Sequence, residues 1–305
     1  MSSVMFNGFS SAAGGNRAPP QSPSTAALEL FWVFDLFIAG GRIAELASLV
    51  TGDNNLFLTL ARDRMGSINL RRLLGRSVQI DDMFFDAVIS VFLPIMKLKY
   101  GHHVAMRTVE AADREKKNAF YSAVETHFLE LAYDENGCVA LNEAITAVAG
   151  PHRQRILDLV AENAVGLSMD TSGNFVVQHV LKLSNPLCTE KMASKLKGHY
   201  VLLSFQKYGS YIVEKILEHP PTTHLVLGDL IECSDRELMR LAGNKYGNYV
   251  LQRALENTFV RRPNLYARLV TKLDPFSGRV LCGGHARNVI DLVHRFDNLL
   301  REVLQ

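Results

Sequence analysis

A six-residue segment recurs along the chain at a nearly constant spacing, and this repeat constrains the fold more than any other feature. The best copies are GNFVVQ at 173–178, GSYIVE at 209–214 and GNYVLQ at 247–252, whose glycines lie 36 and 38 residues apart. Weaker copies begin with glycine at 66, 101 and 137, and a degenerate seventh copy starts near Arg287. A fixed period of this length is typical of stacked helical or β modules. We number the positions of each segment one to six from the glycine.

The repeated units are predicted to be helical, because apolar side chains recur at three- and four-residue spacing and no strand-like alternation persists. Asp63, Asp134 and Asp170 each precede the repeat glycine by three residues, where a short polar side chain can help to start a helix. One such unit is too small to bury its own core, whereas stacked units share a continuous one. The sequence therefore predicts an all-α solenoid.

The chain ends differ from the repeats. Residues 1–27 are rich in Ser, Pro and Gly, with Arg17 as the single charge, and are predicted to be a disordered tail. An organelle-targeting peptide is the alternative, although such peptides are usually rich in Arg. The repeat domain is predicted over 28–305. It comprises an N-terminal cap or degenerate repeat at 28–59, six repeats at 60–260 and a degenerate C-terminal cap repeat at 261–305.

Composition and motifs exclude several classes of protein. Hydrophobic residues make up 48% and charged residues 21%, which is globular composition. The longest apolar stretch, residues 28–39, is too short and too charged to span a bilayer. The four cysteines form no CxxC, so neither a disulfide framework nor a zinc ribbon is expected. The net charge of +2 means that any nucleic-acid binding must depend on where charges lie.

Catalysis is not expected, and neither is a cofactor or a metal site. The sequence has no HExxH, GxSxG or GxxxxGK motif. His102 and His103 are adjacent, but neighbouring side chains on a helix are expected to diverge and to make poor metal partners.

The repeated segment places polar, aromatic and basic side chains on one helix face. Positions two and six are one helical turn apart and point the same way. They carry the pairs Asn174/Gln178, Ser210/Glu214 and Asn248/Gln252. Position three carries Phe175, Tyr211 and Tyr249, and the residue after the segment is often basic, as in Arg72, Arg107, His179, Lys215 and Arg253. Stacked repeats would align three columns that suit the edges, faces and phosphates of single-stranded RNA.

These segments resemble the Pumilio (PUF) repeats of sequence-specific RNA-binding proteins. The resemblance covers roughly residues 60–295 and is most specific over 150–260. It implies a right-handed α-solenoid, a superhelical crescent of about seven Pumilio-type repeats, in which each repeat recognises one base. It further implies a cytoplasmic, monomeric protein that binds messenger RNA in the 3′-untranslated region. Such a protein regulates translation or stability, in some cases through proteins of translational repression or mRNA decay.

The resemblance also implies a recognition code. An Asn/Gln pair recognises uracil, because amides both donate and accept hydrogen bonds. A Ser/Glu pair recognises guanine, whose N1–H and N2–H₂ face the two carboxylate oxygens. The implied core is U–G–U. This triplet is the same in both directions, so the code alone does not give the polarity of the RNA strand. The resemblance implies that the C-terminal repeats bind the 5′ end.

The remaining copies depart from the pattern. Base recognition and a structural role both stay open for the three N-terminal copies, whereas the seventh is interpreted as a capping repeat. The weaker RNA-contact candidates are Ser67, Arg71, His102, Cys138, Asn142 and Arg287, with His103 as a possible stacking ring. Ser67 and Arg71 resemble a combination that favours cytosine, whereas Met106 offers no hydrogen-bond donor beside His102. Because four of seven repeats are eroded, a second function stays open. The chain could instead be a divergent helical-repeat protein that binds structured or ribosomal RNA, or acts mainly as a protein scaffold.

Overall fold

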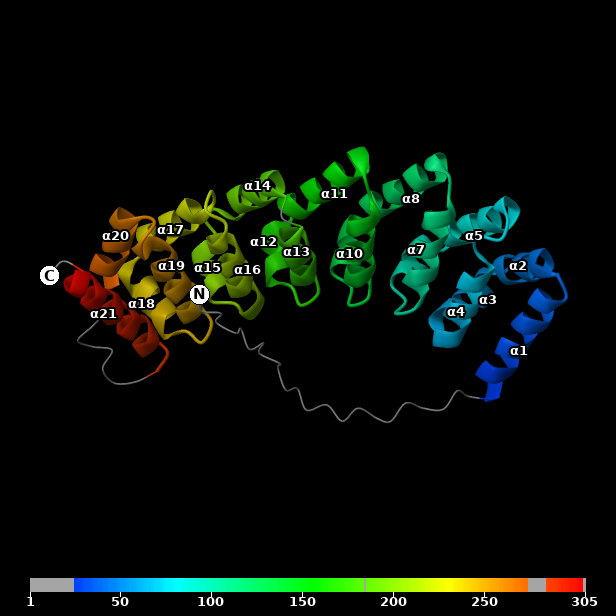
Figure 1. Ribbon diagram of the computed structural model, residues 1–305, viewed down its shortest axis with the longest axis horizontal. Helices are drawn as coiled ribbons and strands as arrows, with labels where there is room; N and C mark the ends of the chain where they lie inside the picture. The colour runs from blue at the N-terminus through cyan, green and yellow to red at the C-terminus, as the bar shows by residue number, and fades with distance from the viewer. Residues whose placement is uncertain (1–24, 184, 274–283, 304–305) are drawn as a thin grey trace.

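The computed structural model describes residues 25–183, 185–273 and 284–303, and these residues form α-helices joined by turns, with no β-strand among them. The helices stack side by side into a curved array, an α-solenoid, as the sequence predicts (Figure 1). None of the helices in the described ranges is both long and apolar enough to cross a membrane.

Each of six repeats contains a connecting helix, an inner helix and an outer helix. The connecting helices are α3 (Asn54–Arg62), α6 (Phe92–Met96), α9 (Phe128–Ala132), α12 (Ala164–Met169), α15 (Tyr200–Ser204) and α18 (Asp235–Gly243). The inner helices, which carry the repeated segment, are α4 (Arg64–Leu73), α7 (Gly101–Ala111), α10 (Gly137–Ala147), α13 (Gly173–Lys182), α16 (Lys207–Glu218) and α19 (Gly247–Phe259). The outer helices are α5 (Val78–Ser90), α8 (Arg114–Thr126), α11 (Gly150–Glu162), α14 (Pro186–Leu196), α17 (Thr223–Glu232) and α20 (Pro263–Leu273).

The repeat glycine lets the connecting helix pack closely against the start of the inner helix. A Cβ atom on Gly209 would lie 2.6 Å from the carbonyl oxygen of Leu203, and one on Gly137 would lie 2.7 Å from that of Leu131. Both distances are far below van der Waals contact, so a side chain at this position would force the two helices apart. The glycines are therefore spaced at the interval at which this close contact between helices recurs.

The predicted capping residues are confirmed. The carboxylates of Asp63, Asp134 and Asp170 accept hydrogen bonds of 2.7 to 2.8 Å from the backbone N–H groups of the glycines three residues later. Asn244 accepts the N–H of Gly247 in the same way at 3.0 Å. These contacts satisfy backbone donors that a helix start leaves unpaired, so α4, α10, α13 and α19 each begin at a defined place relative to the connecting helix. Helices α7 and α16 begin without a side-chain cap.

One hydrophobic core runs through all the repeats. In α13 the residues Val176, Val177 and Val180 are buried, and the inner helices of neighbouring repeats pack against each other along the array. A continuous core keeps the inner helices in register, which is what aligns equivalent side chains from one repeat to the next.

Additional helices cover the two ends of the array. At the N-terminal end α1 (Thr25–Ala39) packs on α4 and α2 (Ile43–Thr51) packs on α5, so they occupy the places of an inner and an outer helix. At the other end α21 (Ala286–Val303) packs on α19. Helix α1 begins three residues before the predicted start of the repeat domain, and residues 1–24 of the predicted tail lie outside the described residues.

Candidate nucleic-acid interface

The α13 pair that is predicted to recognise uracil is arranged differently from the prediction. Asn174 is fully buried, and its Nδ2 donates to the carbonyl oxygens of Asp170 and Thr171 at 2.8 and 2.9 Å. Its Oδ1 accepts a hydrogen bond of 2.8 Å from Nε2 of Gln178. The two side chains therefore do not present two separate polar groups. Asn174 is held by the helix start and in turn holds Gln178.

The same arrangement recurs in α19. Asn248 is fully buried, donates to the carbonyl oxygen of Asn244 at 2.8 Å, and accepts from Nε2 of Gln252 at 2.9 Å. Each asparagine thus fixes which way the glutamine amide points. Both glutamines are half-buried. Nε2 of Gln178 contacts Asn174 through its Oδ1 alone, whereas Nε2 of Gln252 also lies 3.3 Å from the backbone carbonyl oxygen of Asn248. In Gln178 a second N–H and Oε1 are left for a partner that offers both an acceptor and a donor.

The α16 pair that is predicted to recognise guanine lacks such a link. Ser210 is 5% exposed, and its hydroxyl donates to the carbonyl oxygen of Lys207 at 3.3 Å. Glu214 is half-buried, and burial raises the pKa of its carboxyl, as does the charge of Glu218, while Arg253 opposes the rise. A carboxylate with few hydrogen bonds inside the protein is suited to accepting them from a base.

The three rings at position three stand out from the inner surface. Phe175, Tyr211 and Tyr249 are 53%, 40% and 55% exposed, which is unusual for large aromatic side chains and leaves their faces available for stacking. The Nζ of Lys215 lies 5.6 Å from the centre of the Tyr211 ring, a distance at which the cation is attracted to the ring face.

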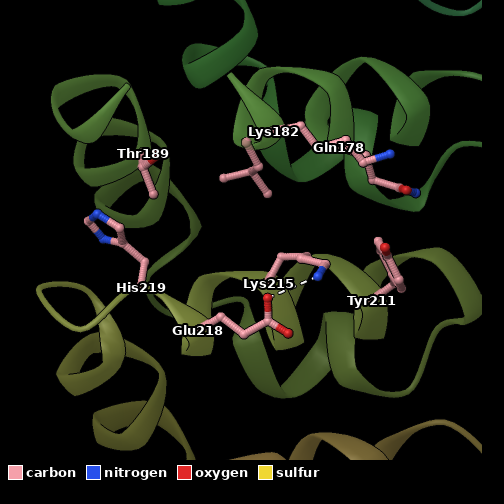
Figure 2. Close-up of a pocket in the computed structure, with 8 residues that line it drawn as sticks. Gln178, Lys182, Thr189, Tyr211, Lys215, Glu218 and His219 are labelled. Atoms are coloured by element: carbon pink, nitrogen blue, oxygen red, sulfur yellow. Dashed lines mark hydrogen bonds and ion pairs between the residues drawn. The ribbon is translucent and has the colours of Figure 1, made fainter. Parts of the chain in front are cut away.

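A cleft of about 350 Å³ separates the α13 repeat from α16. Figure 2 shows Gln178 and Tyr211 facing each other across its opening, with the ion pair between Lys215 and Glu218 (2.9 Å) deeper inside. An amide from one repeat and a ring from the next thus border the same space. A flat base entering this space could meet a hydrogen-bonding edge and a stacking face together.

The basic residues that follow the segment do not form a free column of positive charge. Arg107, Lys215 and Arg253 pair with the acids three residues later, Glu110, Glu218 and Glu256, at 2.9 to 3.2 Å. Arg72 pairs with Asp35 of α1 at 2.6 Å. Local acids therefore compensate much of the charge that a phosphate would otherwise meet.

The N-terminal candidates at position two are buried. Ser67 is 1% exposed, and its hydroxyl donates to the carbonyl oxygen of Tyr100 in the next repeat at 2.8 Å. Cys138 is 2% exposed and contacts the carbonyl oxygen of Glu135. In the arrangement that the structure shows, these two side chains stabilise the scaffold and face away from the inner surface.

The sixth-position candidates Arg71 and Asn142 also contact the protein itself. Nε of Arg71 donates to the carbonyl oxygen of Ser67 at 3.3 Å, and Nδ2 of Asn142 lies 3.5 Å from that of Phe175 in the next repeat. At the C-terminal end Arg287 is exposed on α21, where its Nε lies 3.6 Å from the Asp291 carboxylate.

The histidine pair of α7 does not behave as predicted. The centres of the His102 and His103 rings are only 4.0 Å apart, so the expectation that adjacent side chains diverge is wrong here. His102 is 3% exposed and bonds through Nδ1 to the carbonyl oxygen of Leu98 at 3.0 Å, whereas His103 is partly exposed. The His103 side chain is thus partly accessible, while that of His102 is not.

Sequence reasoning missed Glu143 of α10. Its carboxylate lies 3.5 Å from Nε2 of His102 and 3.6 Å from Nδ1 of His103. The signal was present in the repeat. Glu143 follows its segment directly, a place where five other repeats carry Arg, Lys or His.

Comparison with known proteins decides the family. The sequence profile described as "Pumilio-family RNA binding repeat" matches residues 127–161, 163–196, 199–225 and 238–258. Over 96% of its length the chain is 38% identical to Pumilio homolog 18 of Arabidopsis thaliana, and the alignment covers 96% of that protein. The chain belongs to the Pumilio family. It is also 41% identical to putative pumilio homolog 19 of the same plant, over 83% of this chain and 78% of that one.

Solved Pumilio structures confirm the fold. The Puf4 RNA-binding domain bound to a 3′-UTR recognition sequence of HO endonuclease RNA superposes with a TM-score of 0.72. That match covers 83% of this chain and 80% of that one at 21% identity. The domain of yeast Puf5p bound to MFA2 RNA superposes with a TM-score of 0.65 over 77% and 66% of the two chains, at 18% identity. As a member of this family the chain contains RNA-binding repeats. The family consists of binding proteins rather than enzymes.

Proposed function

We propose that this Pumilio protein binds single-stranded messenger RNA with a UGU core, one base per repeat, and thereby regulates translation or stability of the transcript in the cytoplasm. The observation that carries the proposal is the series α13, α16 and α19. Three consecutive inner helices each combine an exposed ring at position three with a half-buried amide or carboxylate at position six.

The chemistry of each position six supports the order of bases. Gln178 and Gln252 have their amides oriented by Asn174 and Asn248, and an amide side chain has both donor and acceptor groups of the kind that uracil requires. Glu214 has two acceptor oxygens for the two donor groups of guanine. The rings of Phe175, Tyr211 and Tyr249 add stacking that does not depend on base identity.

Two neighbours of known structure support an RNA ligand. The Puf4 and Puf5p domains are each bound to an RNA, and in the Puf4 complex that RNA is a 3′-UTR recognition sequence. Proteins of repression or decay are proposed as further partners.

The test is a competition between short RNAs. Fluorescence anisotropy at one ionic strength compares a nine-nucleotide RNA containing UGU with matched RNAs containing UAU or UCU. We expect UGU to bind about 5- to 150-fold more tightly, the equivalent of about 1–3 kcal/mol for one lost bidentate base contact. Equal affinity for all three would contradict the proposed code, and a preference for folded RNA would favour the structured-RNA alternative. A constant salt concentration is needed because phosphate contacts vary with it.

A further inference from the structure

Three side chains of the types that bind transition metals meet between α7 and α10. His102, His103 and Glu143 each offer one ligand atom, and these atoms all lie within 4.8 Å of one another. Two come from one repeat and the third comes from the next, so the solenoid itself brings them together. The group lies on the inner helices in the eroded half of the array, where base recognition has the least support.

His102 presents a nitrogen whose hydrogen-bonding needs the protein does not meet. Nδ1 of this ring lies 3.0 Å from the carbonyl oxygen of Leu98, a bond that requires the proton on Nδ1. Nε2 of the neutral ring then carries a lone pair. It is buried, has no hydrogen-bond partner among the described residues, and faces the Glu143 carboxylate at 3.5 Å. A lone pair that faces a carboxylate is unfavourable unless a proton or a cation lies between them.

Two of the three separations between the ligand atoms fit a small tetrahedral cation, and the third lies within 4.8 Å. Histidine nitrogen and carboxylate oxygen bind Zn²⁺ at about 2.0–2.2 Å, so two ligand atoms on a tetrahedron lie roughly 3.4 Å apart. In the structure Oε1 of Glu143 lies 3.5 Å from the His102 nitrogen and 3.6 Å from the His103 nitrogen. The Nδ1 contact of His102 with a backbone carbonyl is also the kind of bond that fixes a metal-binding imidazole in place.

We propose that His102, His103 and Glu143 bind a divalent transition-metal cation of the zinc class on the inner surface of the solenoid. Two imidazoles and one carboxylate favour such an ion over Mg²⁺ or Ca²⁺, which prefer oxygen ligands alone. Three protein ligands leave a fourth position for water or another donor. The ion would also change the local charge from −1 to +1 at the place where other repeats carry a basic residue.

The test uses the full chain, purified without a histidine tag, and titrates it with ZnCl₂ in a calorimeter. We expect one tight site per chain. We also expect Co²⁺ to give the visible absorption of a four-coordinate site, and MgCl₂ to give no heat of binding. Glu143→Gln and His103→Ala are both expected to weaken zinc binding by at least about tenfold. His127→Ala is the control, because His127 also faces a carboxylate, that of Glu130 at 3.0 Å, but without a third ligand.

Metal-free melting curves show whether the variants fold. Glu143→Gln keeps the shape of the side chain, so it serves even if His103→Ala does not fold. The proposal is overturned if Glu143→Gln binds zinc as tightly as the unaltered chain, or if His127→Ala weakens binding as much as the site variants do. It is also overturned if nitrogen NMR shows a doubly protonated His102 ring that does not respond to zinc, since the ring would then be ion-paired with Glu143.

Discussion

Inner helices α4, α7 and α10 share a fold with inner helices α13, α16 and α19, yet their repeated segments carry different chemistry. Position two is buried in all six helices. In α13 and α19 the buried residue is an asparagine that orients the glutamine at position six. In α4 it is Ser67, which bonds to the next repeat, and in α7 it is His102, which bonds to the carbonyl oxygen of Leu98 in the turn before that helix. The comparison teaches that position two supports either the recognition residue or the scaffold.

Position three separates the two regions as clearly. The C-terminal helices expose Phe175, Tyr211 and Tyr249, whereas α4 and α10 carry Ile68 and Val139 at the equivalent place. An aliphatic side chain has no π face, so a base gains little by lying on it. We therefore expect the region from α13 to α19 to supply most of the affinity for RNA.

The largest expected effect comes from removing the two amides that are proposed to recognise uracil. The double variant Gln178→Ala, Gln252→Ala should lose about 2–6 kcal/mol of binding free energy for a UGU RNA, because two bidentate contacts of about 1–3 kcal/mol each are lost at separate repeats. The matched variant Arg71→Ala, Asn142→Ala changes the same position in α4 and α10, and should lose less than about 1 kcal/mol. Anisotropy measures both. Similar losses in the two variants would contradict the expectation that the region from α13 to α19 supplies most of the affinity for RNA.

The next effect concerns the choice of the middle base. Glu214→Gln replaces one acceptor oxygen with a donor amide, which suits adenine rather than guanine. Affinity for UGU should fall by about 1–3 kcal/mol, while UAU becomes the preferred RNA of the three tested. Glu232→Gln is the control, because it makes the same change of charge on the exposed surface of outer helix α17. An unchanged preference for UGU would remove Glu214 from the code.

The same carboxyl predicts a smaller, pH-dependent effect. Burial raises the pKa of Glu214 in the free protein, and Glu218 and Glu256 add to the rise, while Arg253 and Lys215 oppose it. Guanine pairs with the ionised form, so bound RNA should lower this pKa. Affinity for UGU should therefore be highest at pH values above the pKa that Glu214 has in the RNA-free protein. Below that pKa, affinity should fall by up to about tenfold per pH unit.

The measurement for this effect is a pH titration of RNA affinity. The unaltered chain is titrated with UGU, and Glu214→Gln is titrated with UAU. The variant lacks the ionisable group, so its affinity should not show the same fall at acid pH. A parallel fall in both proteins would assign the pH dependence to other groups, such as His179 at the rim of the inner surface.

The repeat was enough to predict the solenoid, because a glycine recurs wherever the connecting helix meets the inner helix, and in four of the six repeats a capping side chain precedes it by three residues. The side chains at position six were also predictable, since their spacing follows the helix. The role of Asn174 and Asn248 was not. Whether an amide points to solvent or bonds to the helix start depends on backbone carbonyls that no spacing rule describes. The cluster at His102 was missed because its third member comes from another repeat.

The smallest expected effect tests the scaffold role of position two. Ser67→Ala removes a hydroxyl that donates to the carbonyl oxygen of Tyr100 across a repeat boundary, so the free energy of unfolding should fall by about 1 kcal/mol with no change in RNA affinity. Ser210→Ala removes a hydroxyl whose bond, at 3.3 Å, stays within its own repeat. It should therefore change stability by less than about 0.5 kcal/mol, which denaturant titration can resolve. The two serines occupy the same position of the repeat. If their stability effects were reversed, the bond between repeats would not be what distinguishes the N-terminal region.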